Sequence, residues 1–259
     1  MILRRLSQSL KKQNWTAIVI EFVLLVSGVF LGIQVSNWNA ERETRQKSAI
    51  FTARLVADLR VEAWAYEYLI EYNKDVLSNA RKALDALSGE QPLSDEQLLI
   101  SAYRATQYES QDRRRAAFDE LVSTGTIGLI TDQRLRETAT GVYSTTIIDQ
   151  TMTEAKQSEY RLLFRKVMPA QIQQALMEKC GDRVVDPLDY ARIVHSLDYP
   201  CTLDLPPEKI IVAVQALRAQ PNLVPTLQLR FADTGTVLAN LQNYNTTLLK
   251  NLRQIGGRK

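Results

Sequence analysis

The sequence predicts an all-α protein in which an N-terminal transmembrane helix continues into an elongated antiparallel helical bundle. Three observations support this prediction. An apolar run occupies residues 17–35, a heptad pattern of apolar residues follows it, and the 259 residues include only 10 glycines and 8 prolines. Heptads are typical of helices that pack along one stripe, and scarce helix breakers permit long helices. We therefore divide the chain into segments 1–14, 15–39 and 40–259.

The segment at residues 15–39 has the features of a membrane span. An apolar helix of about 19 residues is about 28 Å long, which matches the hydrocarbon core of a bilayer. Trp15 and Trp38 lie where interfacial aromatic residues anchor a span. A cleavable signal peptide is the alternative interpretation, but Gln34 and Trp38 occupy positions where a cleavage site requires small side chains.

The flanking charges predict the orientation of this span. Residues 1–14 contain no acidic residue and four basic ones, which are Arg4, Arg5, Lys11 and Lys12. Because basic flanks stay on the cytoplasmic side, we expect a cytoplasmic basic tail at 1–14. Residues 40–259 would then lie in the periplasm, with the chain anchored in the inner membrane of a bacterium.

Both cysteines fall in the segment predicted to be periplasmic. Cys180 and Cys201 would close a loop of about 20 residues, worth about 3 kcal/mol as a disulfide in the chain-entropy model. An oxidising compartment permits this bond, and two unpaired thiols are the alternative. A metal site is disfavoured because the sequence has no CxxC and only one histidine, His195.

Glu21 interrupts the apolar run and shares one helix face with three small residues. At about 100° per residue, Glu21, Gly28, Gly32 and Ser36 fall within an arc of about 80°. Gly28 and Gly32 form a GxxxG pair, which lets two helices approach closely. We therefore expect this face to pack against a second copy of the chain or another membrane protein. The alternative is that Glu21 reaches water near the cytoplasmic surface.

Beyond the span, an a/d stripe predicts one helix that continues to the turn "SGEQP" at residues 88–92. The stripe consists of Ala49, Val56, Leu59, Ala63, Tyr66, Ile70, Asn73, Leu77, Ala80, Leu84 and Leu87. Such a stripe packs equally well within one chain or between chains, so the heptads leave the stoichiometry open.

Local signals mark the remaining helices. Ser94 and Gln97 have the spacing of a capping box, and Gly125 is placed to end a helix. We expect Thr131 or Asp132 to start a long helix toward Cys180, which Pro169 kinks or interrupts. A short helix opens with the prolines at 206–207, and a last helix repeats the heptad from Phe231 to Ile255, with Gly235 as its weakest point.

Two motifs resemble a family of uncharacterised bacterial single-pass membrane proteins. They are "EFVLLVSGVFLGIQVSNWNAER" and "AAFDELVSTGTIGLITDQRLRETATGVYS". The matching positions are Glu21, Gly28, Gly32, Asn37, Trp38, Asn39, Phe118, Leu121, Gly125, Leu135, Arg136 and Tyr143. The resemblance implies a membrane-anchored helical protein and no known activity.

The second motif has a structural interpretation. We expect Phe118, Leu121 and Leu135 to form the core of a helix-turn-helix corner, with Gly125 as a left-handed cap; a ligand pocket is the alternative. The neighbouring "QDRRRAAFDE" is a mixed-charge cluster, typical of a solvated face, with an anion site as the alternative.

Composition and motifs narrow the function. The net charge of +3 comes from 32 basic and 29 acidic residues that are interleaved along the chain, so we expect no nucleic-acid partner. Nucleophile, zinc and phosphate-loop motifs are absent, so we expect neither an enzyme nor a cofactor. The favoured function is an interaction or scaffold protein that associates with itself or joins a membrane complex. The alternative is a periplasmic ligand sensor that signals through a membrane partner.

Overall fold

The computed structural model describes residues 15–110 and 112–257, and the regular elements in those ranges are all helices. The all-α prediction is therefore confirmed, whereas the predicted tail at 1–14 lies outside the described residues. The elements are α2 (Trp15–Ser88), α3 (Asp95–Arg104), α4 (Ala116–Ser123), η1 (Ile127–Leu129), α5 (Gln133–Ser144), α6 (Ile147–Lys156), α7 (Glu159–Val167), α8 (Ala170–Cys180), α9 (Arg192–Leu197), α10 (Pro207–Arg218), α11 (Leu223–Ala239), η2 (Asn240–Tyr244) and α12 (Thr246–Ile255).

The chain divides into two compact units. The first contains the part of α2 up to Ala53 and also residues 128–131. Within it, the Ser48 hydroxyl donates a hydrogen bond to the carbonyl oxygen of Leu129 at 2.6 Å. The second unit contains residues 54–127 and the chain from Asp132 onward. The apolar run lies in the first unit, and both cysteines lie in the second.

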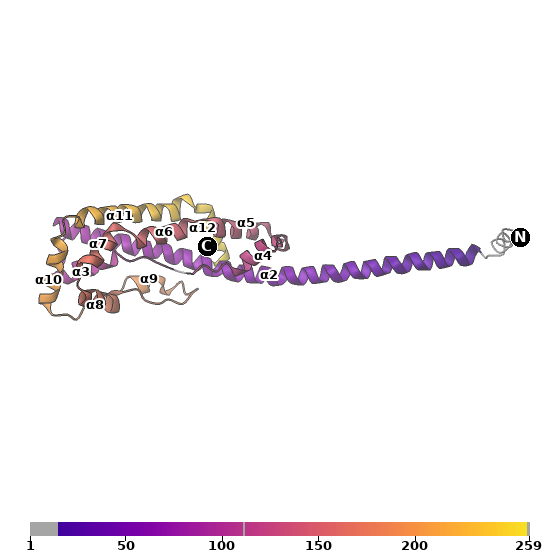
Figure 1. Cartoon of the computed structure of the whole chain (residues 1–259), viewed down its shortest axis with the longest axis horizontal. Coiled ribbons are helices and arrows are strands. Elements are labelled where there is room, and N and C mark those ends of the chain that lie inside the picture. The colour runs from indigo at the N-terminus through magenta and orange to yellow at the C-terminus, as the bar shows by residue number, and fades with distance from the viewer. Residues whose placement is uncertain (1–14, 111, 258–259) are drawn as a thin grey trace. The chain divides into compact units, whose positions relative to one another are not determined.

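In the second unit, α2 is the central helix. Ten of the twelve side chains from Glu62 to Asn73 are buried, which far exceeds what a helix packed along a single stripe covers. Other helices of this unit run along this part of α2 (Figure 1). The predicted heptad stripe is therefore only one of several buried faces.

In the main core of the second unit, small residues of α2 pack together with larger residues of the neighbouring helices. Its members include Ala80 and Ala83 of α2, Leu98 and Leu99 of α3, Tyr160 and Phe164 of α7, Leu176 of α8, Leu217 of α10 and Leu227 of α11. Helix α10 contacts α3, and α11 contacts α7. Alanine has a short side chain that loses no conformational entropy on burial, so neighbouring helices can pack closely against it.

The expected helix ends are confirmed at several places. Ser94 and Gln97 form a reciprocal capping box at the start of α3. The Asp132 side chain accepts a hydrogen bond from the Leu135 backbone N–H at the start of α5. Helix α10 begins with Pro207 at its first position. Each of these residues satisfies or replaces a backbone N–H that a helix start leaves unpaired.

The single long helix expected between Asp132 and Cys180 is wrong. Four helices, α5 to α8, occupy this stretch. Ser158 starts α7 by accepting a hydrogen bond from the Arg161 backbone N–H, and Pro169 stands immediately before α8. A serine side chain can cap a new helix and so competes with continuation of the old one. The expected interruption at Pro169 is present.

The last helix also breaks at an unexpected place. Gly235 lies within α11, and the regular helix instead changes at η2, a π-helical turn. Here the Tyr66 hydroxyl donates to the carbonyl oxygen of Leu241 at 3.1 Å, and the Asn245 side chain donates to the carbonyl oxygen of Asn240 at 2.8 Å. Side chains that satisfy the carbonyls of the widened turn stabilise it there.

Candidate functional site

The apolar stretch of α2 is exposed in the structure. The described part of the chain includes one helix that is long and apolar enough to cross a membrane, and its apolar window is not buried. Trp15 is 75% exposed and Trp38 is 61% exposed, one at each end of the predicted span. The structure therefore provides a helix with the length and surface of a membrane span.

The predicted packing face lies on this exposed helix. Glu21, Gly28, Gly32 and Ser36 are all exposed. A Cβ built on either glycine would meet no atom within 4 Å. The motif residues Asn37 and Asn39 are exposed on the same helix. Within the described residues, this face is thus open to a partner outside the chain.

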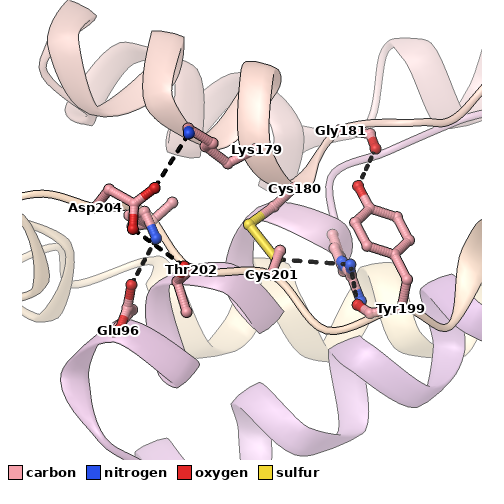
Figure 2. Close-up of a disulfide and its surroundings, with 10 residues drawn as sticks. Glu96, Lys179, Cys180, Gly181, Tyr199, Cys201, Thr202 and Asp204 are labelled. Atoms are coloured by element: carbon pink, nitrogen blue, oxygen red, sulfur yellow. Dashed lines mark hydrogen bonds and ion pairs between the residues drawn. A yellow bond between two sulfur atoms is a disulfide. The ribbon is translucent and has the colours of Figure 1, made fainter.

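The structure joins Cys180 and Cys201 in a disulfide, with their Cα atoms 5.5 Å apart. Figure 2 shows the bond connecting the end of α8 to the segment that precedes α10. Beside it, the Tyr199 hydroxyl donates to the carbonyl oxygen of Gly181, and Lys179 pairs with Asp204 at 3.1 Å. The disulfide and the Tyr199 bond close the same loop, residues 181–200.

This disulfide loop and the segment after it are also fastened to α2 and α3. Tyr72 donates to the carboxylate of Asp182 at 2.8 Å, and the Leu203 backbone N–H donates to Glu96 at 2.7 Å. Under the loop, Ile193 and Leu197 of α9 pack on an aromatic row of α2. That row consists of Trp64, Tyr68 and Tyr72, at one-turn intervals. The loop therefore covers a small aromatic core of its own.

Two carboxylates on successive turns of α2 hold the segment that precedes α4. The Glu62 carboxylate is 3% exposed and accepts from Arg113 Nε at 2.7 Å and from the Arg114 backbone N–H at 2.6 Å. Asp58 accepts from the Ala117 backbone N–H at 3.2 Å. Asp58 thereby caps the N-terminus of α4, whose own cap residue, Arg115, provides no side-chain capping hydrogen bond.

These contacts correct the interpretation of the mixed-charge cluster as a solvated face. Arg114, Arg115 and Asp119 are exposed, as that interpretation requires. Arg113 instead reaches inward to Glu62 and also donates to the carbonyl oxygen of Val142 at 2.9 Å. The local sequence does not distinguish a solvated charged face from a buried ion pair, because the partner of Arg113 is 51 residues away.

The downstream motif residues surround this anchor. Leu121 is fully buried and Leu135 nearly so, while Arg136 is half-buried. The rings of Phe118 and Tyr143 lie 4.8 Å apart between centroids. The structure thus places these motif residues in and around a packed corner.

Gly125 and Tyr143 fix the backbone of the same corner. Gly125 has a φ of +69°, which lies in the left-handed region that glycine adopts without strain. The Tyr143 hydroxyl donates to the carbonyl oxygen of Arg114 at 2.5 Å. Burial raises the pKa of Tyr143, so this hydroxyl stays protonated as the donor.

Sequence reasoning missed a group of arginines at the end of α3. Arg230 of α11 is 5% exposed and donates to the carbonyl oxygens of Ala105 and Gln107, and Arg161 of α7 donates to that of Thr106. These carbonyls follow the last helical turn and have no intrahelical partner. Burial lowers the pKa of Arg230 to about 10, so it remains charged at neutral pH.

Asp75 of α2 carries a half-buried carboxyl group, and it lines one cavity together with Asp198, which follows α9. Burial is the main cause that raises its pKa to about 6, and the negative charge of Asp198 adds to this effect. Arg104 and Lys82 oppose it. Asp75 therefore titrates between the acidic and the neutral range.

Potential metal ligands are not grouped in the described part of the chain. In the described ranges, no three His, Cys, Asp or Glu side chains are grouped so that they could hold a metal ion. His195 is exposed on α9.

Comparisons of the chain with protein-family models, with curated proteins and with solved structures find no match. The resemblance to uncharacterised single-pass membrane proteins therefore stays a prediction that rests on the two motifs.

Proposed function

We propose that this chain is a membrane-anchored interaction protein without enzymatic activity. In this proposal, α2 crosses the inner membrane of a bacterium and the second unit lies in the periplasm. The observation that carries it is the apolar window of α2, which no described part of the chain covers. Apolar surface of this extent is unfavourable in water and favourable in a bilayer.

Two further observations support the orientation. Basic residues precede the apolar run and acidic ones do not, which agrees with a cytoplasmic N-terminus. The disulfide between Cys180 and Cys201 agrees with an oxidising compartment for the second unit.

The exposed face of Glu21, Gly28, Gly32 and Ser36 supports association in the membrane. Both glycines lack neighbours within 4 Å of a built Cβ, so a partner helix can approach the backbone there. A carboxyl group in the membrane gains most from a hydrogen-bond partner, which the opposite helix would supply. We propose that the partner is a second copy of this chain or another single-pass protein.

Membrane fractionation tests the anchor. We expect the protein to stay in the membrane after an alkaline carbonate wash and to be released by detergent, with an intact N-terminus. Protease added to spheroplasts should cleave the second unit. A soluble periplasmic protein whose N-terminus begins after the apolar run would instead identify that run as a cleaved signal.

A second function, sensing of a small ligand, is supported by a separate observation. A cavity of about 590 Å³ opens beside Trp64 and Arg114 in the second unit. A bundle that binds a ligand there could pass its effect to a partner in the membrane.

A further inference from the structure

The cavity beside Trp64 has walls from three parts of the second unit. Helix α2 contributes Val61 and Trp64, the segment before α4 contributes Asp112 and Arg114, and the disulfide loop contributes Val185 and Pro187. Its volume of about 590 Å³ is ample for a small organic molecule. The site exists only while the disulfide loop stays against α2.

Several charged residues around the cavity are already committed to the fold. Arg113 is paired with Glu62, Arg115 with Asp119, and Asp58 caps α4. Among the described residues, the guanidinium of Arg114 and the carboxylate of Asp112 form no hydrogen bond or ion pair. Both side chains are exposed, so they are available at the cavity wall.

Trp64 gives the cavity a rigid aromatic wall. Its side chain is 2% exposed, and its Nε1–H is the one buried polar side-chain atom in the described chain that lacks a hydrogen-bond partner. That atom has almost no accessible surface, so a ligand in the cavity meets the ring rather than the N–H. The ring itself is fixed because it stacks on Tyr68 at 5.2 Å between centroids.

We infer that this cavity binds a small zwitterion of the α-amino-acid type with an apolar side chain. The ligand carboxylate accepts hydrogen bonds from Arg114. Its ammonium group pairs with Asp112. Its side chain packs against Val61, Val185 and Pro187.

This assignment uses both charged side chains that the fold leaves available at the cavity and its apolar wall. A simple carboxylic acid would leave Asp112 without a cation, and a simple amine would leave Arg114 without an anion. Charge-assisted hydrogen bonds are the strong ones, so a ligand that provides both charges binds best. The inference deepens the sensing function and rests on it for its biological role.

Calorimetric titration of the full-length protein in detergent tests the inference. The probes are L-leucine, L-valine and L-phenylalanine, and the comparison compounds are 4-methylpentanoate and 3-methylbutylamine, which each lack one charge of leucine. We expect at least one amino acid to bind, and the acid and the amine to bind about tenfold more weakly or worse. Absence of binding by all three amino acids at millimolar concentration, or equal binding of the acid or the amine, would overturn the inference.

Variants locate the site. Arg114→Gln and Asp112→Asn should each weaken amino-acid binding about tenfold. Arg134→Gln, an exposed arginine of α5 outside the cavity, is the matched control. If Arg114→Gln and Arg134→Gln bind alike, the assignment is wrong. The fractionation experiment is independent, so failure here would leave the membrane anchor unaffected.

Discussion

Glu62 and Arg113 form a buried ion pair at 2.7 Å across 51 residues of sequence. The other oxygen of the same carboxylate holds the Arg114 backbone. One side chain of α2 thus positions both the segment before α4 and one wall of the cavity. Asp58, one turn earlier on α2, holds the start of α4 beside it.

Glu62→Ala should therefore be strongly destabilising. It leaves the half-buried Arg113 without its counter-charge and the Arg114 N–H without its acceptor, so we expect a loss of about 3–5 kcal/mol in the free energy of unfolding. Chemical denaturation followed by circular dichroism measures it. The control is Arg115→Ala, which breaks an exposed pair with Asp119 and should cost at most about 1 kcal/mol. Equal effects of the two substitutions would show that Glu62 is not an anchor.

Gly125→Ala should destabilise the same corner through its backbone. The φ of +69° strains a residue with a Cβ, although open space surrounds the position. We expect a loss of about 1 kcal/mol in the free energy of unfolding, measured in the same way. Gly128→Ala is the matched control, because that glycine also lies in open space but has no positive φ. A neutral Gly125→Ala would argue against the left-handed cap.

Local signals predicted the parts of the fold that local physics determines. The capping box at Ser94, the proline start of α10 and the positive φ of Gly125 are each recognisable within a few residues. The break before α8 at Pro169 was predicted. The break at Ser158 was missed because serine also occurs inside helices, and its cap forms only where the chain turns.

Long-range partners escaped the sequence analysis for a different reason. Arg230 caps carbonyls that lie 123 and 125 residues away, and no local pattern connects them. Glu62, in contrast, could be recognised from the sequence around it. It is an acidic residue inside the aromatic and apolar stretch "VEAWAYEYLIEY" of α2, where a charge has to be paired if the helix is buried on every side.

Removal of the disulfide should destabilise the second unit. Cys180→Ser opens a loop with a sequence separation of 21, and we expect a loss of about 2–4 kcal/mol in the free energy of unfolding. Thermal denaturation with and without a dithiol reductant measures the effect. The reductant should bring the wild-type protein close to the variant and leave the variant unchanged. A variant as stable as the oxidised wild-type protein would show that the hydrogen bonds of Tyr72 and Tyr199 hold the loop alone.

Asp75 should make stability depend on pH. Its folded pKa of about 6 exceeds the ordinary value of 3.8, so the folded state binds the proton more tightly than the unfolded state. This contribution to stability is complete below about pH 4 and is lost as the pH rises through 6.

Asp75→Asn removes the ionisation and should therefore gain stability relative to the wild-type protein as the pH rises from about 4 to 7. We expect the difference between the two proteins to change by about 1–2 kcal/mol, because the carboxyl group is only partly buried. Denaturation curves at several pH values measure it. A constant difference across this range would contradict the raised pKa.

Native mass spectrometry of the protein, purified from its own membrane in a gentle detergent, tests whether the exposed face of α2 associates in the membrane. We predict a defined oligomer or a defined hetero-complex that Gly28→Leu or Gly32→Leu dissociates. Ser27→Leu is the control, since Ser27 lies about 120° around the helix from Glu21 and should leave the assembly intact. A monomer, or an assembly that survives both glycine substitutions, would contradict the claim.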